Sequence, residues 1–177
     1  MIPSSVTAAS SLLAHKLQVR PIGLDDFSEL RYLHARSLSA QTVDVLTDEE
    51  VTAFEALVYS PAYTHMLMQE EVFGAWLEDE LVGTVSWHAI GDDGQSAGIG
   101  PVFVHYTRLG IGRRLLAEAE ARACQSGFDK FAGWATANAV PFFERFGYRI
   151  VSRGVKTLSP ACALPVAFLR KEVLPAD

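Results

Sequence analysis

The sequence predicts a single α+β domain, in which one mixed, mostly antiparallel sheet of about seven strands is flanked by about four helices. Segments with strand alternation and segments with helical spacing both occur, and their order places two helices after the first strand and three linked strands in the middle. A length of 177 residues fits one domain with one core, and 49% hydrophobic against 20% charged residues excludes a disordered chain.

Residues 1–15 carry no structural pattern. They are rich in Ser and Ala and lack a clear apolar period, so we expect a tail there and one domain over residues 16–177.

Seven segments have the alternation or the short apolar run of a strand. They span residues 17–22, 72–77, 81–88, 97–104, 130–135, 148–155 and 166–173. The charged residues 78–80 and the turn Gly91-Asp92-Asp93-Gly94 separate the second, third and fourth of them. These three strands are therefore expected to form an antiparallel meander.

Four segments have apolar residues at helical spacing. They begin at Asp25 or Asp26, after Thr47, at Gly110 and at Pro141, and the last two end at Gly127 and Phe146. The spacing of Thr47 and Glu50 predicts a capping box at the start of the second helix. Ser60-Pro61 is expected to break that helix.

Charge and cysteine content restrict the class of protein. The chain has 15 Lys and Arg against 21 Asp and Glu, and a net charge of −6 disfavours bulk nucleic-acid binding. No apolar run has the length of a membrane helix, and the first residues lack a signal peptide's features. Cys124 and Cys162 show no metal-ligand spacing, so we expect two free buried thiols and no metal site. We therefore expect a cytoplasmic protein that binds neither nucleic acid nor membranes.

The strongest local signal lies where the fourth strand leads into the third helix, over residues 107–114. Unpaired N–H groups converge at the start of such a helix, and Gly110 and Gly112 let the backbone approach a phosphate. Arg108, Arg113 and Arg114 add positive charge. The loop predicts a diphosphate site, and a tight turn with solvated arginines is the alternative. It matches neither a Walker A sequence nor GxGxxG.

The segment Thr107–Gly112 resembles the acetyl-CoA motif of the GCN5-related N-acetyltransferase (GNAT) family, Arg/Gln-x-x-Gly-x-Gly/Ala, with Thr107 at the first position. Residues 135–148 are similar to the family's second motif, Asn-Ala-x-x-Phe-Tyr-Glu-x-x-Gly-Phe. Both occur in the family's order and spacing. The resemblance implies the family fold, splayed between its fourth and fifth strands, and acetyl-CoA as acyl donor.

The resemblance also implies which residues bind acetyl-CoA. Main-chain groups of Val102 and Val104 would bond the pantetheine, which Asn138 would also contact, and the amides of residues 109–114 would hold the diphosphate. The expected set is Val102, Phe103, Val104, Arg108, Leu109, Gly110, Ile111, Gly112, Arg113, Arg114, Asn138 and Phe143.

Two catalytic groups that are frequent in the family are missing. The Tyr that protonates the leaving thiolate falls on Phe143, and the Glu of the fourth strand falls on Gly98. If the preceding turn is centred near Asp93, His88 lies opposite Gly98 and points to the same face. Because imidazole titrates near neutral pH, His88 is a candidate substitute base, and a satisfied sheet histidine is the alternative.

The residues and the resemblance together predict an N-acetyltransferase that moves acetyl from acetyl-CoA to a primary amine by direct attack on the thioester. A catalytically silent acyl-CoA sensor or interaction module and a nucleotide-diphosphate binder are the alternatives. The sequence does not decide whether the acceptor is a small molecule or a peptide, or how long the acyl group is. It also leaves open whether the protein forms a homodimer. Asp44 and residues 48–50 fit either an acidic pocket for a cationic amine or solvated carboxylates at a helix start.

Overall fold

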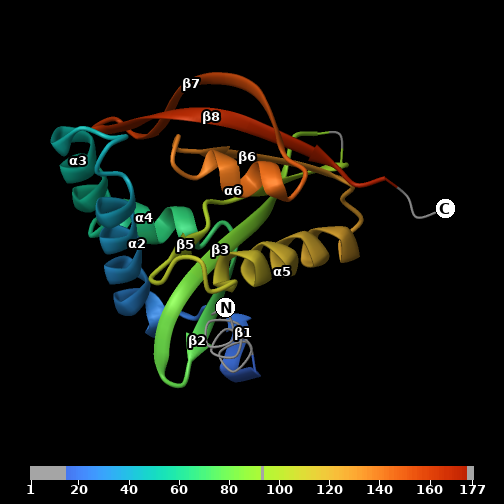
Figure 1. Cartoon of the computed structure of the whole chain (residues 1–177), viewed down its shortest axis with the longest axis horizontal. Helices are drawn as coiled ribbons and strands as arrows, with labels where there is room; N and C mark the ends of the chain where they lie inside the picture. Colours follow the sequence, from blue (N-terminus) through green and yellow to red (C-terminus); the bar gives the residue numbers. More distant parts are fainter. Residues whose placement is uncertain (1–14, 93, 175–177) are drawn as a thin grey trace, which may run out of the picture.

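A single eight-stranded sheet forms the centre of the molecule (Figure 1). The computed structural model describes residues 15–92 and 94–174, so the expected tail lies outside the described residues except for His15. The strands are β1 (Leu17–Pro21), β2 (Glu71–Leu77), β3 (Glu80–Ile90), β4 (Ser96–Ile99), β5 (Phe103–Val104), β6 (Lys130–Ala135), β7 (Arg149–Ser159) and β8 (Cys162–Glu172). Their order is β1-β2-β3-β4-β6-β8-β7, and β5 pairs with β3. All pairs are antiparallel except β4 with β6.

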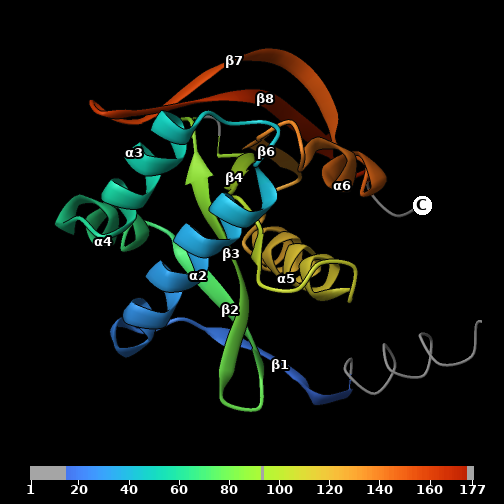
Figure 2. The ribbon, with the colours of Figure 1, turned by 60° about the vertical axis from the view of Figure 1, so that its left-hand side comes forward.

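Helices lie on both faces of this sheet (Figure 2). They are α2 (Phe27–Gln41), α3 (Asp48–Val58), α4 (Pro61–Leu67), α5 (Ile111–Gln125) and α6 (Val140–Arg145), with a 3-10 turn at Leu24–Asp26. One apolar cluster joins α5 and α6 to the sheet, and a second joins α2, α3 and α4 to its opposite face. None of the helices in the described part of the chain is long and apolar enough to cross a membrane.

The predicted fold class is confirmed, but the sequence did not predict helix α4. The capping box is present, because the Thr47 side chain accepts from the Glu50 amide at 3.2 Å and the Thr47 amide donates to Glu50 at 2.9 Å. Pro61 ends one helix but also starts α4, since a proline fits the first turn, where no N–H partner is needed.

The two cysteines differ in exposure. Cys162 is buried as expected, whereas the expectation that Cys124 is buried is wrong, because its side chain is exposed. The buried face of α5 passes through Leu115, Ala119 and Ala123, and the next residue along the helix turns away from the sheet.

The predicted fourth strand is interrupted where it meets the end of β6. Pairing of β4 with β6 extends from Ser96–Lys130 to Gly98–Ala132 and then stops, which confirms the expected splay. Three residues, 100–102, separate Ile99 from Phe103, whereas only two separate their β3 partners Trp87 and Thr84. The extra residue makes a bulge, where Pro101 costs no ladder hydrogen bond.

The packing of α5 against the sheet is expected to carry much of the stability. Leu115 is fully buried there, so Leu115→Ala should lower the free energy of unfolding by about 3 kcal/mol through lost burial and a residual cavity. Urea unfolding of both proteins measures the difference. Leu24→Ala, at a leucine that is 65% exposed, is the control and should change it by less than about 0.5 kcal/mol. Equal losses in the two variants would contradict this account.

Candidate functional site

Two hollows open at the gap between β4 and β6. The first, which we call the groove, has a volume of about 420 Å³ and lies between the C-terminal end of α2, residues 101–104, the start of α5, and α6. The second, which we call the cavity, has a volume of about 360 Å³ and lies between the sheet and helices α2, α3 and α4. Pro101, Phe103 and Trp134 line both. The two hollows therefore meet at the bulge.

The start of α5 forms one end of the groove. Gly110 precedes the helix with a φ of 78°, a left-handed conformation that glycine adopts without strain, and Arg108 has a φ of 63°. The Arg114 amide donates to the Gly110 carbonyl, so the amides of residues 111–113 have no partner within the helix. Gly112 packs closely against Phe142, because an added Cβ would lie 3.1 Å from that ring and the ring would have to shift.

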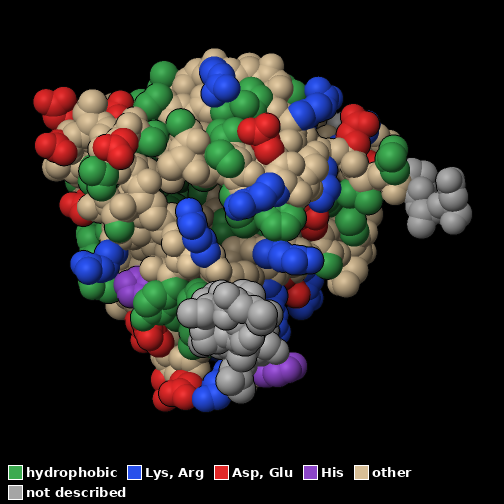
Figure 3. Space-filling view, in the orientation of Figure 1, with side chains coloured by type: hydrophobic (Ala, Val, Ile, Leu, Met, Phe, Trp, Pro, Cys, Tyr) green, Lys and Arg blue, Asp and Glu red, His purple; other side chains and the backbone are tan. Residues whose placement is uncertain are grey.

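Basic side chains surround this end of the groove. Figure 3 shows Lys and Arg side chains gathered over α6 and the start of α5, and Arg108 and Arg145 line the groove itself. Free amides, the positive end of the helix dipole and two guanidinium groups together suit a phosphate.

Only some of the twelve residues expected to bind the donor line the groove. Seven line the groove, namely Val102, Phe103, Val104, Arg108, Gly112, Asn138 and Phe143. Leu109, Gly110 and Ile111 lie beside it in the loop and the first turn of α5, and Arg113 is exposed outside its lining. Arg114 donates from its guanidinium to the Leu17 carbonyl at 2.8 Å, on the β1 side of α5. This contact removes the Arg114 side chain from the groups that face the groove.

The main chain of Val104 is only partly available. Its carbonyl accepts hydrogen bonds from Ser37 at 2.9 Å and from Gln41 at 2.8 Å, both on α2. The neighbouring His105 amide donates to Val82 of β3, so the Val104 amide points away from β3. The Val104 N–H, and not its carbonyl, is therefore left for a bound molecule.

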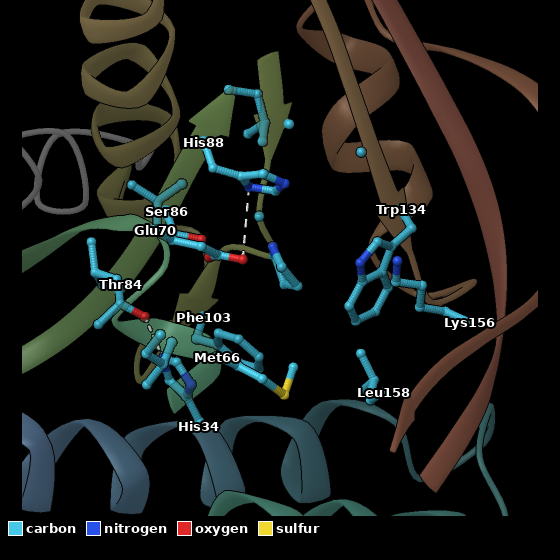
Figure 4. Close-up of a pocket in the computed structure, with 18 of the residues that line it drawn as sticks. His34, Met66, Glu70, Thr84, Ser86, His88, Phe103, Trp134, Lys156 and Leu158 are labelled. Atoms are coloured by element: carbon cyan, nitrogen blue, oxygen red, sulfur yellow. Dashed lines mark hydrogen bonds and ion pairs between the residues drawn. The ribbon is translucent and has the colours of Figure 1, made fainter. Parts of the chain in front are cut away.

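His88 and Glu70 form the polar side of the cavity (Figure 4). His88 pairs with Gly98 as the turn predicted, and a Cβ on Gly98 would lie 2.6 Å from the imidazole Cε1. The Nδ1 atom lies 3.7 Å from Glu70 Oε1 and has no hydrogen-bond partner among the described residues. With Nδ1 directed at Glu70, Nε2 is the imidazole nitrogen left for a ligand.

A buried hydrogen-bonded group supports the wall of the cavity nearest α2 (Figure 4). The ring nitrogens of His34 lie 2.6 Å from the Tyr63 hydroxyl and 2.6 Å from the Thr84 hydroxyl, and its ring stacks on Phe103 with centroids 3.9 Å apart. Burial lowers the pKa of His34 to about 3 and raises the pKa of Tyr63, so both side chains are neutral near pH 7. The group ties α2 and α4 to β3 and β5.

The remaining lining residues were missed by the sequence analysis. Trp134 and Lys156 lie across the cavity from His88, on β6 and β7 (Figure 4). Glu70 and Lys156 belong to no motif, and only the folded chain brings them together. The acidic residues 48–50 form the first turn of α3 and do not line the cavity, which favours the helix-start interpretation.

The position of the family's tyrosine holds a buried ring. Phe143 is 3% exposed and packs edge-on against Tyr148, with ring centroids 5.3 Å apart. The Tyr148 hydroxyl donates to Glu120 of α5 at 2.9 Å. It therefore does not replace the hydroxyl that Phe143 lacks. Ser86 places a hydroxyl against Gly100 in the cavity lining, next to Pro101, which both hollows share.

Comparison with known proteins identifies the family. The sequence model of the acetyltransferase (GNAT) domain matches residues 42–157, which is more than half of the chain. The chain belongs to the GNAT acetyltransferase family. No curated protein matches this GNAT chain by sequence. No group of three or more His, Cys, Asp or Glu side chains suited to a metal ion occurs in the described parts of this GNAT domain.

Solved structures share the GNAT fold at low sequence identity. A GCN5-related N-acetyltransferase from Rhodopseudomonas palustris has a TM-score of 0.77 and 23% identity, over 88% of this chain and 95% of that chain. The PaiA N-acetyltransferase from Thermoplasma acidophilum, solved with coenzyme A, has a TM-score of 0.69 and 15% identity, over 88% and 98%. A GCN5-related N-acetyltransferase from Kribbella flavida has a TM-score of 0.61 and 17% identity, over 90% of this chain and 99% of that chain.

The neutral state of His34 has a consequence for stability. Its folded-state pKa of about 3 lies below the ordinary value of 6.5, so between these values the unfolded chain binds a proton that the folded chain excludes. Above about pH 6.5 His34 is neutral in both states and the free energy of unfolding is at its full value. As the pH falls below that, the free energy of unfolding decreases by up to about 1.4 kcal/mol for each pH unit.

Urea unfolding at about pH 7, 6 and 5 tests this expectation. His34→Gln should remove most of the decline, although the variant is less stable throughout because it loses ring contacts. His65→Gln, at an exposed histidine on α4, should retain the wild-type pH dependence. The same decline in the His34 variant as in the wild type would show that His34 is not its source.

Proposed function

We propose that this GNAT chain is an N-acetyltransferase that transfers acetyl from acetyl-CoA to a primary amine. The observation that supports it most is that groove and cavity share Pro101, Phe103 and Trp134 at the end of the β4–β6 pairing. A donor in the groove and an acceptor in the cavity would thus present their reacting groups to each other. That proximity lowers the entropic part of the barrier.

Acetyl-CoA fits the groove by its chemistry. Its diphosphate would face the free amides of residues 111–113 and the Arg108 guanidinium, and its pantetheine would face the Val104 amide and Asn138. The Asn138 Oδ1 accepts from Thr136 at 2.7 Å, which leaves its NH₂ group for the pantetheine. The coenzyme A in the structurally similar PaiA enzyme supports this assignment.

The cavity supplies the acid–base chemistry. A neutral amine attacks the thioester carbonyl, a C–N bond forms, the C–S bond breaks and the amine loses one proton. We assign the proton to His88 Nε2, and Glu70 stabilises the resulting imidazolium from the Nδ1 side. Ser86 donates a hydrogen bond to the leaving sulfur, which departs as a thiolate and takes its proton from water, while His88 returns the amine's proton to water. Three other expectations stay predictions. They are a cytoplasmic location, a peptide as the alternative acceptor, and a homodimer.

The donor assignment is tested at Arg108. Arg108→Gln removes a charge-assisted bond to the diphosphate and should weaken coenzyme A binding about tenfold, measured by calorimetry. Arg122→Gln is the matched control, because Arg122 pairs with Glu118 at 3.0 Å near the other end of α5 and should leave binding unchanged. Equal affinities of the wild type and the Arg108 variant would remove Arg108 from the site.

The base is tested at His88. His88→Gln should lower kcat for thiol release about a hundredfold and remove the acidic limb of the pH–rate profile, while coenzyme A binding persists. His65→Gln should keep both the rate and the limb. An unchanged profile would show that another group takes the proton.

The alternative of a silent acyl-CoA-binding module predicts a different outcome. It requires tight coenzyme A binding and no thiol release with any amine of a broad panel. Thiol release with any primary amine would exclude it.

A further inference from the structure

We propose that the acceptor is a small apolar amine that also carries a carboxylate, that is, an amino-acid-like zwitterion. Its amine would lie at Glu70 and His88, and its carboxylate at Lys156. The inference rests on the proposed function and specifies the substrate class of the same site.

The charges that line the cavity are few and are of opposite sign. Among the described lining residues, Glu70 is the only carboxylate and Lys156 the only lysine or arginine. His34 adds no charge, because burial keeps it neutral. Figure 4 places Glu70 with His88 on one side of the cavity and Lys156 beside Trp134 on the other. A ligand that spans the cavity meets a negative and then a positive group.

Lys156 is held in the lining without a protein anion. It projects from β7 and is half-buried, and it has no ion-pair partner among the residues that the structure describes. A partly desolvated ammonium gains most from a ligand anion, because water no longer solvates it fully.

Much of the rest of the cavity lining is apolar. It includes Met66, Leu67, Ile90, Leu158 and Phe168. This lining, with a volume of about 360 Å³, suits a small molecule with a hydrocarbon body. A polyamine would place a second ammonium against this surface or against Lys156, where no further carboxylate receives it.

Binding of matched probes tests the inference without requiring turnover. Calorimetry in the presence of coenzyme A would compare 4-(aminomethyl)benzoate with benzylamine, and 6-aminohexanoate with hexylamine and 1,6-diaminohexane. At least one carboxylate probe should bind about tenfold or more tightly than its partner without the carboxylate. Lys156→Met should abolish that preference, and Lys156→Glu should transfer it to the diamine. Thiol release from acetyl-CoA, measured in parallel, should follow the same order.

Arg153→Met is the matched control, because Arg153 lies on the same strand but is exposed and outside the cavity lining, and it should keep the wild-type preference. Circular dichroism verifies that each variant is folded. The inference is overturned if neither carboxylate probe is preferred by the wild type, or if Lys156→Met retains the preference. A carboxylate preference in binding without thiol release from any amine would overturn the proposed acetyl transfer and support the assignment of Lys156.

Discussion

The end of the hydrogen bonding between β4 and β6 is the constraint on which the other features of the site depend. Parallel strands that stay paired would bury this region under continuous sheet, and no molecule could pass between its two faces. The extra residue in the segment 100–102 bends the chain away from β6 directly after Gly98. The groove, the cavity and their shared lining at Pro101 all follow from that one change in register.

An opening in a sheet leaves backbone groups and edges that other elements must stabilise. Helix α2 does much of this, because Ser37 and Gln41 bond the Val104 carbonyl while His34 stacks on Phe103 and joins β3 to α4. The short β5 has only two residues in the ladder, so it depends on these side-chain contacts for its position. The polar group around His34 is thus structural, although its members also line the cavity.

The sequence predicted those features that depend on neighbouring residues. The turn after Ile90 set the pairing of His88 with Gly98, and the glycines near residue 110 marked the start of α5. Helix α4 was missed, because a proline both ends one helix and begins another. Glu70 and Lys156 could not be found in this way, since they are 86 positions apart and only the pairing of β7 at the edge of the sheet brings both to one cavity.

The two sides of the cavity belong to strands that differ in how many neighbours they pair with. His88 belongs to β3, an interior strand paired with β2 and β4, whereas Lys156 belongs to β7, the outermost strand, which pairs with β8 alone. Substitutions on an edge strand disturb one ladder, and those on β3 disturb several. If Lys156 selects the acceptor as proposed, changes in β7 can therefore alter that selectivity with little effect on the strand pairing around His88.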